Sequence, residues 1–337
     1  MLTRIRISSG NLKFTTDDPI VIGLVNNMPD AALQTTERQF RELLSVASRD
    51  RAVSLRLFSL PQLPRAEAAK SHLSEHYEDI DELWTTRLDG LIVTGTEPRA
   101  SALPHEPYWP TLTKLIDWAE EHTTSTIWSC LAAHAAVLHS DGISRRPFRE
   151  KLSGVFDCMK AADHPIMADA PSRWRVPHSR YNDLPVEALD SMGYRILSKL
   201  PDAGADMFVK EGKSLFVFLQ GHPEYEPEAL LREYRRDIRR FLAGERDSYP
   251  EMPRGYFDEQ TAAAFGEFRQ QAQRNRGTYL LLNFPALEPE MSLPYSWHEL
   301  AVRLYANWLS YLVERRHLSF GLKKADSTSA SRSNRVE

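Results

Sequence analysis

Short apolar segments alternate along the chain with longer segments in which apolar residues recur at helical spacing. The apolar segments have the length of buried strands and lie at 20–25, 53–58, 89–95 and 125–128. After the first of them, Thr36 and Gln39 fit a capping box, which predicts that the next helix begins at Thr36. Because strand and helix alternate, the sequence predicts an α/β fold, a doubly wound and mostly parallel sheet.

After Gly142 the alternation of strands and helices is less regular. Further strands are predicted at 151–156, 173–176, 194–198, 207–210 and 214–219, and further helices at 228–242, 260–273 and 295–316. The whole pattern predicts an N-terminal lead-in over residues 1–18 and a single domain over 19–318. Residues 319–337 are rich in Ser, Lys and Arg, which predicts a disordered tail.

Three loops of the predicted sheet follow strand ends, at 26–29, at 95–99 and at Cys130. The carboxyl ends of parallel strands lie at the same edge of a sheet, and binding sites form beyond that edge. We therefore expect these loops to lie close together around a site.

Cys130 lies where a β-favouring run, 125–128, changes to an alanine-rich helical segment. A residue at such a turn can project from a sharp elbow, where free N–H groups and the helix dipole favour a thiolate. The thiolate is the nucleophilic form of cysteine. The alternative is that Cys130 is a small buried apolar residue, as most free cysteines are.

A second candidate lies past the predicted strand 214–219, where His222 and Glu224 are two positions apart. With Cys130 they would complete a catalytic triad, in which His222 takes the thiol proton and Glu224 orients the imidazole. His222 and Glu224 are also possible metal ligands. No third ligand follows at a supporting spacing, so no metal is expected.

Composition, charge and the missing motifs argue against several classes of function. A net charge of −4 gives no basis for binding nucleic acid or anionic membranes, and no apolar run reaches the length of a membrane span. No GxGxxG motif or P-loop is present, so neither a tightly bound dinucleotide nor a kinase-type reaction is indicated. Two cysteines, Cys130 and Cys158, are too few for a disulfide framework, and the N-terminus lacks a signal-peptide pattern. We therefore expect a cytoplasmic protein that binds neither nucleic acid nor a membrane.

Segments between residues 20 and 315 match one known pattern in order. They are Asn27-Met-Pro, Asp89-Gly-Leu-Ile-Val-Thr-Gly, Tyr108-Trp, Cys130 with its helix, Lys151-Leu-Ser-Gly-Val-Phe, Pro177-His-Ser-Arg-Tyr, Gly221-His-Pro-Glu-Tyr, Glu233-Tyr-Arg-Arg-Asp and Asn307-Trp-Leu. In these segments the chain resembles the homoserine O-succinyltransferase and O-acetyltransferase family. The fold of that family is similar to the class-I glutamine amidotransferases, a flavodoxin-like architecture.

The resemblance implies an acyltransferase of methionine biosynthesis that works by a ping-pong reaction. An acyl-CoA would be the co-substrate, with no bound cofactor, and the acyl group would pass through a Cys130 thioester to the hydroxyl of homoserine or a similar hydroxy-amino acid. His222 would be the base, Glu224 its orienter, and the N–H of Leu131 an oxyanion donor. The implied substrate contacts are Lys151, Ser179, Arg180 and Arg236. The resemblance also implies a homodimer.

Two positions depart from the family's pattern. Ala31 stands where the family has a lysine, and Arg99 occupies a position, normally Gly or Glu, that helps to select the acyl donor. An inward-pointing Arg99 would pair with the free carboxylate of a succinyl group, which favours succinyl over acetyl.

Two alternatives stay open. One is a glutamine-amidotransferase-like hydrolase with the same triad, although Ala132 and His134 stand where those enzymes have Gly and Gln. The other is a non-catalytic binding protein on the same fold.

Overall fold

The computed structural model describes residues 18–285 and 295–333. The predicted lead-in over 1–18 lies, apart from Asp18, outside the described residues. Among the described residues, none of the helices combines the length and the apolar character that crossing a bilayer requires.

One half of the sheet is parallel. In the described part of the chain, one sheet of nine strands has the order β2-β1-β3-β4-β9-β8-β7-β5-β6. Its parallel strands are β1 (Ile20–Val25), β2 (Val53–Phe58), β3 (Gly90–Val93), β4 (Ser125–Ser129) and β9 (Leu215–Leu219). With β9 as the fifth strand, this is the 2-1-3-4-5 order of flavodoxin-like sheets.

The other half of the sheet is antiparallel. It consists of β5 (Arg146–Lys160), β6 (Arg173–Asp183), β7 (Arg195–Leu200) and β8 (Gly204–Glu211). The strands predicted at 194–198 and 207–210 are confirmed as β7 and β8, which pair with each other. Strands β5 and β6 are longer than predicted because they pair with each other across a register shift between Pro147 and Leu152.

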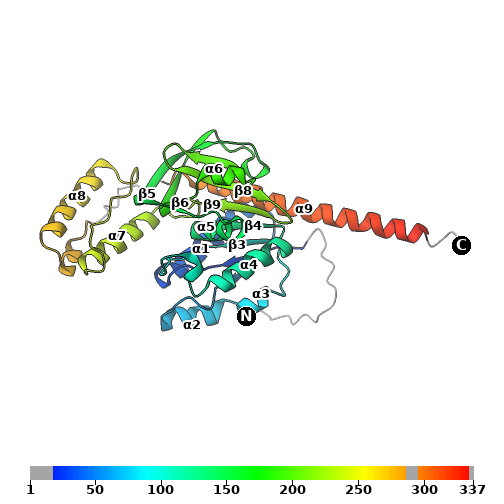
Figure 1. The fold of residues 1–337 in the computed structure, drawn as a ribbon, viewed down its shortest axis with the longest axis horizontal. Coiled ribbons are helices and arrows are strands. Elements are labelled where there is room, and N and C mark those ends of the chain that lie inside the picture. The colour runs from blue at the N-terminus through cyan, green and yellow to red at the C-terminus, as the bar shows by residue number, and fades with distance from the viewer. Residues whose placement is uncertain (1–17, 286–294, 334–337) are drawn as a thin grey trace.

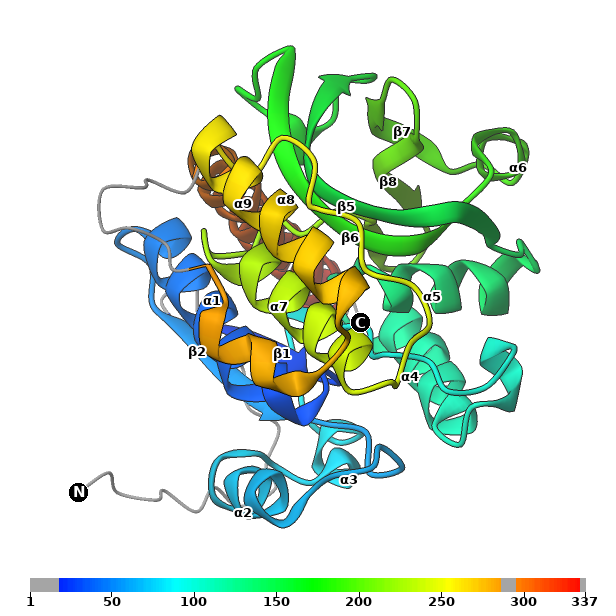
Figure 2. The same cartoon turned by 90° about the vertical axis from the view of Figure 1, so that its left-hand side faces the viewer.

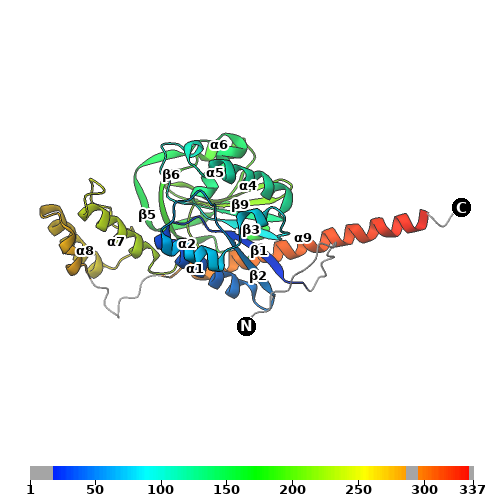
Figure 3. The ribbon, with the colours of Figure 1, turned by 90° about the horizontal axis from the view of Figure 1, so that it is seen from below.

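Helices cover both faces of the sheet, which confirms the doubly wound fold. On one face α1 (Asp30–Ser48) and α9 (His298–Ser333) pack together, as Figure 3 shows. On the other face lie α4 (Trp109–His122) and α5 (Leu131–Asp141). The shorter helices are α2 (Glu67–His76), α3 (Ile80–Leu83) and α6 (Val186–Ser191), with 3-10 turns η1 (Leu103–His105) and η2 (Pro165–Met167).

Two helix ends differ from the predictions. Helix α1 begins at Asp30, not at Thr36, because Pro29 (φ −57°) precedes it and Asp30 supplies a negative charge to its first turn. Helix α9 continues to Ser333 (Figure 1), through most of the segment predicted to be a disordered tail. A lack of apolar residues removes a reason to pack, but it does not end a helix, and no proline interrupts this one.

Helices α7 (Ala229–Leu242) and α8 (Glu259–Arg274) pack against each other beside the sheet (Figures 1 and 2). Their shared cluster contains Ile238 and Phe241 from α7, Phe265 and Phe268 from α8, and Leu280 from η3 (Thr278–Asn283). This packing holds α7 in place, and α7 carries residues of the site described next.

Candidate active site

A cavity of about 350 Å³ opens at the carboxyl edge of the parallel strands. The loops predicted to meet there do so, because Met28, Pro29, Cys130 and residues 94–98 all line it. Side chains from β5, β6 and α7 close the opposite wall. The prediction that these loops would lie close together is therefore confirmed.

Cys130 lies on a strained turn between β4 and α5. Its backbone has φ 52° and ψ −112°, a conformation that non-glycine residues rarely adopt, and its N–H donates to Leu219 O at 2.7 Å. Such strain persists only where the surroundings enforce it, and it is typical of functional sites. The turn presents Cys130 to the cavity from the N-terminus of α5.

The Leu131 N–H lies at the first position of α5, where no intrahelical acceptor exists. The loop after β3 approaches it closely, because a Cβ on Gly95 would lie 2.9 Å from Leu131 N and 2.6 Å from Leu131 Cβ. Only glycine fits there. The predicted oxyanion donor therefore borders the cavity beside Cys130, next to the backbone of the Gly95 loop.

His222 and Glu224 lie on the same cavity wall, just past β9. His222 Nδ1 donates to Glu224 Oε1 at 2.8 Å, since a carboxylate only accepts. Burial alone would lower the pKa of His222, but the negative charges of Glu224 and of Cys130 as a thiolate hold that pKa well above its ordinary value. The Tyr225 ring stacks on the imidazole, with 4.2 Å between centroids. The three predicted triad residues are therefore brought together.

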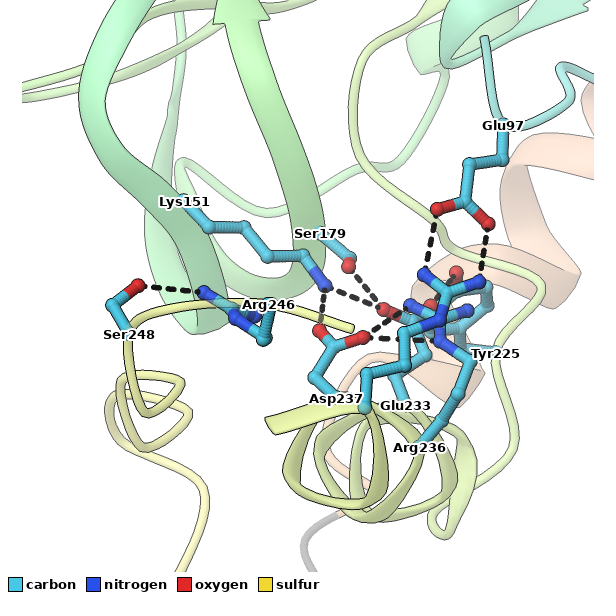
Figure 4. Close-up of polar contacts among 10 residues, drawn as sticks. Glu97, Lys151, Ser179, Tyr225, Glu233, Arg236, Asp237, Arg246 and Ser248 are labelled. Carbon is cyan, nitrogen blue, oxygen red and sulfur yellow. Dashed lines mark hydrogen bonds and ion pairs between the residues drawn. The ribbon is translucent and has the colours of Figure 1, made fainter. Parts of the chain in front are cut away.

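Lys151 and Ser179 belong to a partly buried polar network on the wall formed by β5, β6 and α7 (Figure 4). Lys151 Nζ lies 3.1 Å from Glu233 Oε2 and 3.1 Å from Asp237 Oδ2. Ser179 Oγ also donates to Glu233, and so does the Tyr225 hydroxyl, at 2.6 Å. Burial alone would raise the pKa of Glu233, but the charges of Lys151 and Arg236 and these hydrogen bonds lower it to about 2.

Arg236 reaches the cavity from α7. Its Nε and Nη2 bind Asp237 Oδ1 at 3.0 and 2.9 Å, and about a third of its side chain is exposed. Asp237 thus holds the guanidinium in place beside the cavity. An amino-acid carboxylate there could use the remaining donors of Arg236.

Arg180 borders the same cavity, but its guanidinium is already bound within the protein. It is buried and donates to Asp183 Oδ1 at 2.8 Å, Gln220 Oε1 at 3.0 Å and Ala203 O at 3.0 Å. Gln220 Oε1 also accepts from His134 Nε2 at 2.8 Å. Arg180 therefore acts on the site indirectly, by holding Asp183 and Gln220 in place.

Arg99 is not brought into this cavity. Its side chain is exposed and lines a neighbouring cavity, while its backbone N–H donates to Glu106 Oε1 at 2.6 Å. Glu97, two residues earlier, lines both cavities and forms a bidentate pair with Arg240 at 2.6 and 2.9 Å. The loop path, which the sequence does not reveal, decides this difference.

The sequence reasoning also missed Arg145, Glu233 and Asp237 as residues of this region. Glu233 and Asp237 are four positions apart, so they share one face of a helix. This spacing could have indicated that the two carboxylates act together. Five arginines in the same helix obscured it. Arg145 lies in an irregular segment between α5 and β5, where no periodicity identifies a lining residue.

One group of possible metal ligands lies among the described residues: Cys158, His178 and Asp206, all buried, with ligand atoms within 4.8 Å of one another. Arg180 Nε donates to His178 Nδ1 at 3.3 Å. This neighbouring cation disfavours an added metal cation. Burial raises the pKa of the Cys158 thiol, which also disfavours the thiolate that a metal requires.

Comparison with known proteins gives a consistent set of relatives. A sequence model of the family described as homoserine O-succinyltransferase matches residues 13–318. The chain is similar to homoserine O-succinyltransferase from Rhodopseudomonas palustris, at 49% identity over 86% of this chain and 87% of the relative. It is also similar to the enzyme of that name from Thiothrix nivea, at 39% identity over 86% of this chain and 81% of the relative.

Solved structures with a similar chain path include a glutamine amidotransferase from Thermotoga maritima. It is 15% identical, with a TM-score of 0.49, over 88% of this chain and 99% of that chain. A second, from Methylobacillus flagellatus, is 12% identical with a TM-score of 0.48, over 87% of this chain and 94% of that chain.

Proposed function

This chain belongs to the homoserine O-succinyltransferase family, and we propose that it transfers a succinyl group from succinyl-CoA to the hydroxyl of homoserine. The observation that carries the proposal is Cys130 on its strained turn, in one cavity with the paired His222 and Glu224. This arrangement suits an acyl-enzyme reaction, because it supplies a nucleophile, a base and a group that orients the base.

The first half of the reaction forms a thioester. The Cys130 sulfur attacks the carbonyl of the acyl-CoA, with His222 holding a proton, and the Leu131 N–H stabilises the oxyanion. The bond from the acyl carbon to the CoA sulfur breaks. The departing sulfur takes the proton from His222, which becomes neutral.

The second half regenerates the enzyme. The hydroxyl of homoserine gives its proton to His222 while its oxygen attacks the acyl carbon, and the bond to the Cys130 sulfur breaks. Glu224 accepts the Nδ1 hydrogen bond throughout and keeps Nε2 available for this proton transfer. The enzyme is left with its thiolate and its protonated His222, as at the start.

In this proposal Arg236, which lines the cavity, binds the carboxylate of homoserine, because its planar guanidinium can donate to two oxygens. Lys151 and Ser179 act in this proposal through Glu233, which both of them contact. Their hydrogen bonds hold the wall of α7 against β5 and β6, and so fix where Arg236 lies.

The same proposal includes a homodimer in the cytoplasm that takes its acyl group from free acyl-CoA. Both cysteines are free thiols, as in proteins of a reducing compartment. The homodimer rests on the family likeness alone, and light scattering of the purified protein would test it.

Intact-protein mass spectrometry after mixing with succinyl-CoA tests the proposed function. We expect one succinyl adduct, absent in Cys130→Ala, present in Cys158→Ala, and discharged by homoserine as O-succinylhomoserine. Cys158→Ala is the matched control because Cys158 is the other thiol and is buried away from the cavity. The absence of an adduct, or its discharge by water as fast as by homoserine, would contradict the proposal.

A further inference from the structure

We propose that Arg145 binds the terminal carboxylate of the succinyl group while that group is carried on Cys130. Arg145 would then be the residue that selects succinyl-CoA over donors with an uncharged acyl chain. This inference rests on the proposed function and gives the succinyl specificity a physical origin.

The four Lys and Arg side chains that line the cavity differ in what they bind. They are Arg145, Lys151, Arg180 and Arg236. Lys151 binds Glu233 and Asp237, Arg236 binds Asp237, and Arg180 donates to several oxygens within the protein. Within residues 18–285 and 295–333, Arg145 forms no hydrogen bond or ion pair, although it is only partly exposed. Arg236 keeps some donors for the acceptor, whereas all the donors of Arg145 are unused within the described residues.

Arg145 lies near the nucleophile. Both residues line the same cavity, which Arg145 reaches from the segment between α5 and β5. Burial lowers the pKa of Arg145, and the negative charges that Tyr108, Cys130 and Glu106 can carry act against that shift, so the guanidinium lies within electrostatic reach of these groups.

Glu106 acts on Arg145 only through space and forms no ion pair with it, and its Oε1 is held by the backbone N–H groups of Arg99 at 2.6 Å and of Ala100 at 2.7 Å. A half-buried guanidinium without a direct ion pair or hydrogen bond has lost part of its hydration and has no contact that compensates for the loss. An anionic ligand in the cavity would supply that contact.

The chemistry of the acyl group fits this position. A succinyl group ends in a carboxylate two methylene groups beyond its carbonyl, so the carboxylate stays in the cavity while the carbonyl is bonded to Cys130 Sγ. A guanidinium donates two parallel hydrogen bonds to a carboxylate. An acetyl group ends at its methyl carbon and offers Arg145 nothing to bind.

Donor competition in the wild-type enzyme is the first test and needs no variant. Butyryl-CoA has an acyl chain of the same length as succinyl-CoA, with a methyl group in place of the carboxylate. We expect kcat/KM with homoserine to be at least about tenfold higher for succinyl-CoA, because butyryl-CoA cannot form the charge-assisted hydrogen bonds to Arg145. Equal kcat/KM values for these two donors would overturn the inference.

Variants then assign the effect to Arg145. In Arg145→Met, the ratio of kcat/KM for succinyl-CoA to that for butyryl-CoA should fall by about tenfold or more, and Arg145→Lys should retain part of it. The matched control is Arg146→Met, an exposed arginine one residue along, which should leave the ratio unchanged.

An equal loss for both donors in Arg145→Met would assign the residue to the shared CoA portion and overturn the inference, and so would an unchanged ratio. If Arg145→Met does not fold, the wild-type comparison and Arg145→Lys decide. A wild-type protein that forms no thioester at Cys130 with any donor would instead refute the proposed function itself.

Discussion

His222 Nδ1 lies 2.8 Å from Glu224 Oε1, and both side chains are buried on the wall of the Cys130 cavity. The charge of Glu224 is one reason why the pKa of His222 is raised, against the opposing effect of burial. A group with a raised folded pKa stabilises the fold below its unfolded pKa, near 6.5, and that contribution is lost as the pH rises through the folded pKa.

Glu224→Gln should therefore lower the pKa of His222 and reduce kcat by about 10²-fold or more, because the imidazole loses its charged orienter. Imidazole NMR and a pH–rate profile of both proteins would measure the two effects. The loss of stability should be largest below pH 6.5 and should shrink at higher pH. A His222 pKa that is unchanged in Glu224→Gln would show that Glu224 acts only by packing.

Replacing Cys130 should separate catalysis from stability. The φ of 52° at this residue disfavours every side chain, so Cys130→Gly should be more stable than Cys130→Ala by about 1 kcal/mol, while both lack transfer activity. Urea unfolding of the two variants makes the comparison. If Cys130→Ala is as stable as Cys130→Gly, the turn is not strained.

Glu233 should make the fold sensitive to acid. Its pKa is lowered from 4.5 to about 2, so the charge network stabilises the protein above pH 4.5 and loses this contribution as the pH falls toward 2. Wild type should therefore lose about 2–3 kcal/mol more of its unfolding free energy between pH 6 and pH 3 than Glu233→Gln does. Parallel stability curves for the two proteins would show that Glu233 is not held ionised by Lys151.

Much of this architecture could be predicted because it follows from strand order. Cys130 and His222 follow strand ends in the sequence, and a parallel sheet places such ends at one edge. The sequence does not reveal how a loop travels beyond its strand. Arg99 and Arg145 both come from irregular segments, and only the path of each segment decides which one reaches the cavity. The ion pair of Glu233 with Lys151 is equally non-local, because it joins α7 to β5, 82 positions earlier in the chain.

Arg236 should affect the acceptor more than the donor. Arg236→Ala should raise the KM for homoserine by about tenfold or more, with a much smaller change in the KM for succinyl-CoA, because it removes the carboxylate partner. Steady-state kinetics with each substrate varied in turn would measure both constants. Arg239→Ala is the control, since Arg239 is an exposed arginine on the same helix. A larger effect on the succinyl-CoA KM would place Arg236 at the donor.

Arg99→Glu tests whether the loop after β3 selects the acyl donor through charge. The side chain is exposed and lies outside the lining of the Cys130 cavity, while Glu106 holds its backbone N–H at 2.6 Å, so the substitution should leave the loop in place. Solvent and salt screen the charge of an exposed side chain strongly. We therefore expect the ratio of kcat/KM for succinyl-CoA to that for acetyl-CoA to change by less than about twofold, measured at low and at ordinary salt. A shift of tenfold toward acetyl-CoA would instead mean that Arg99 turns inward when the donor binds and carries the selectivity assigned to Arg145.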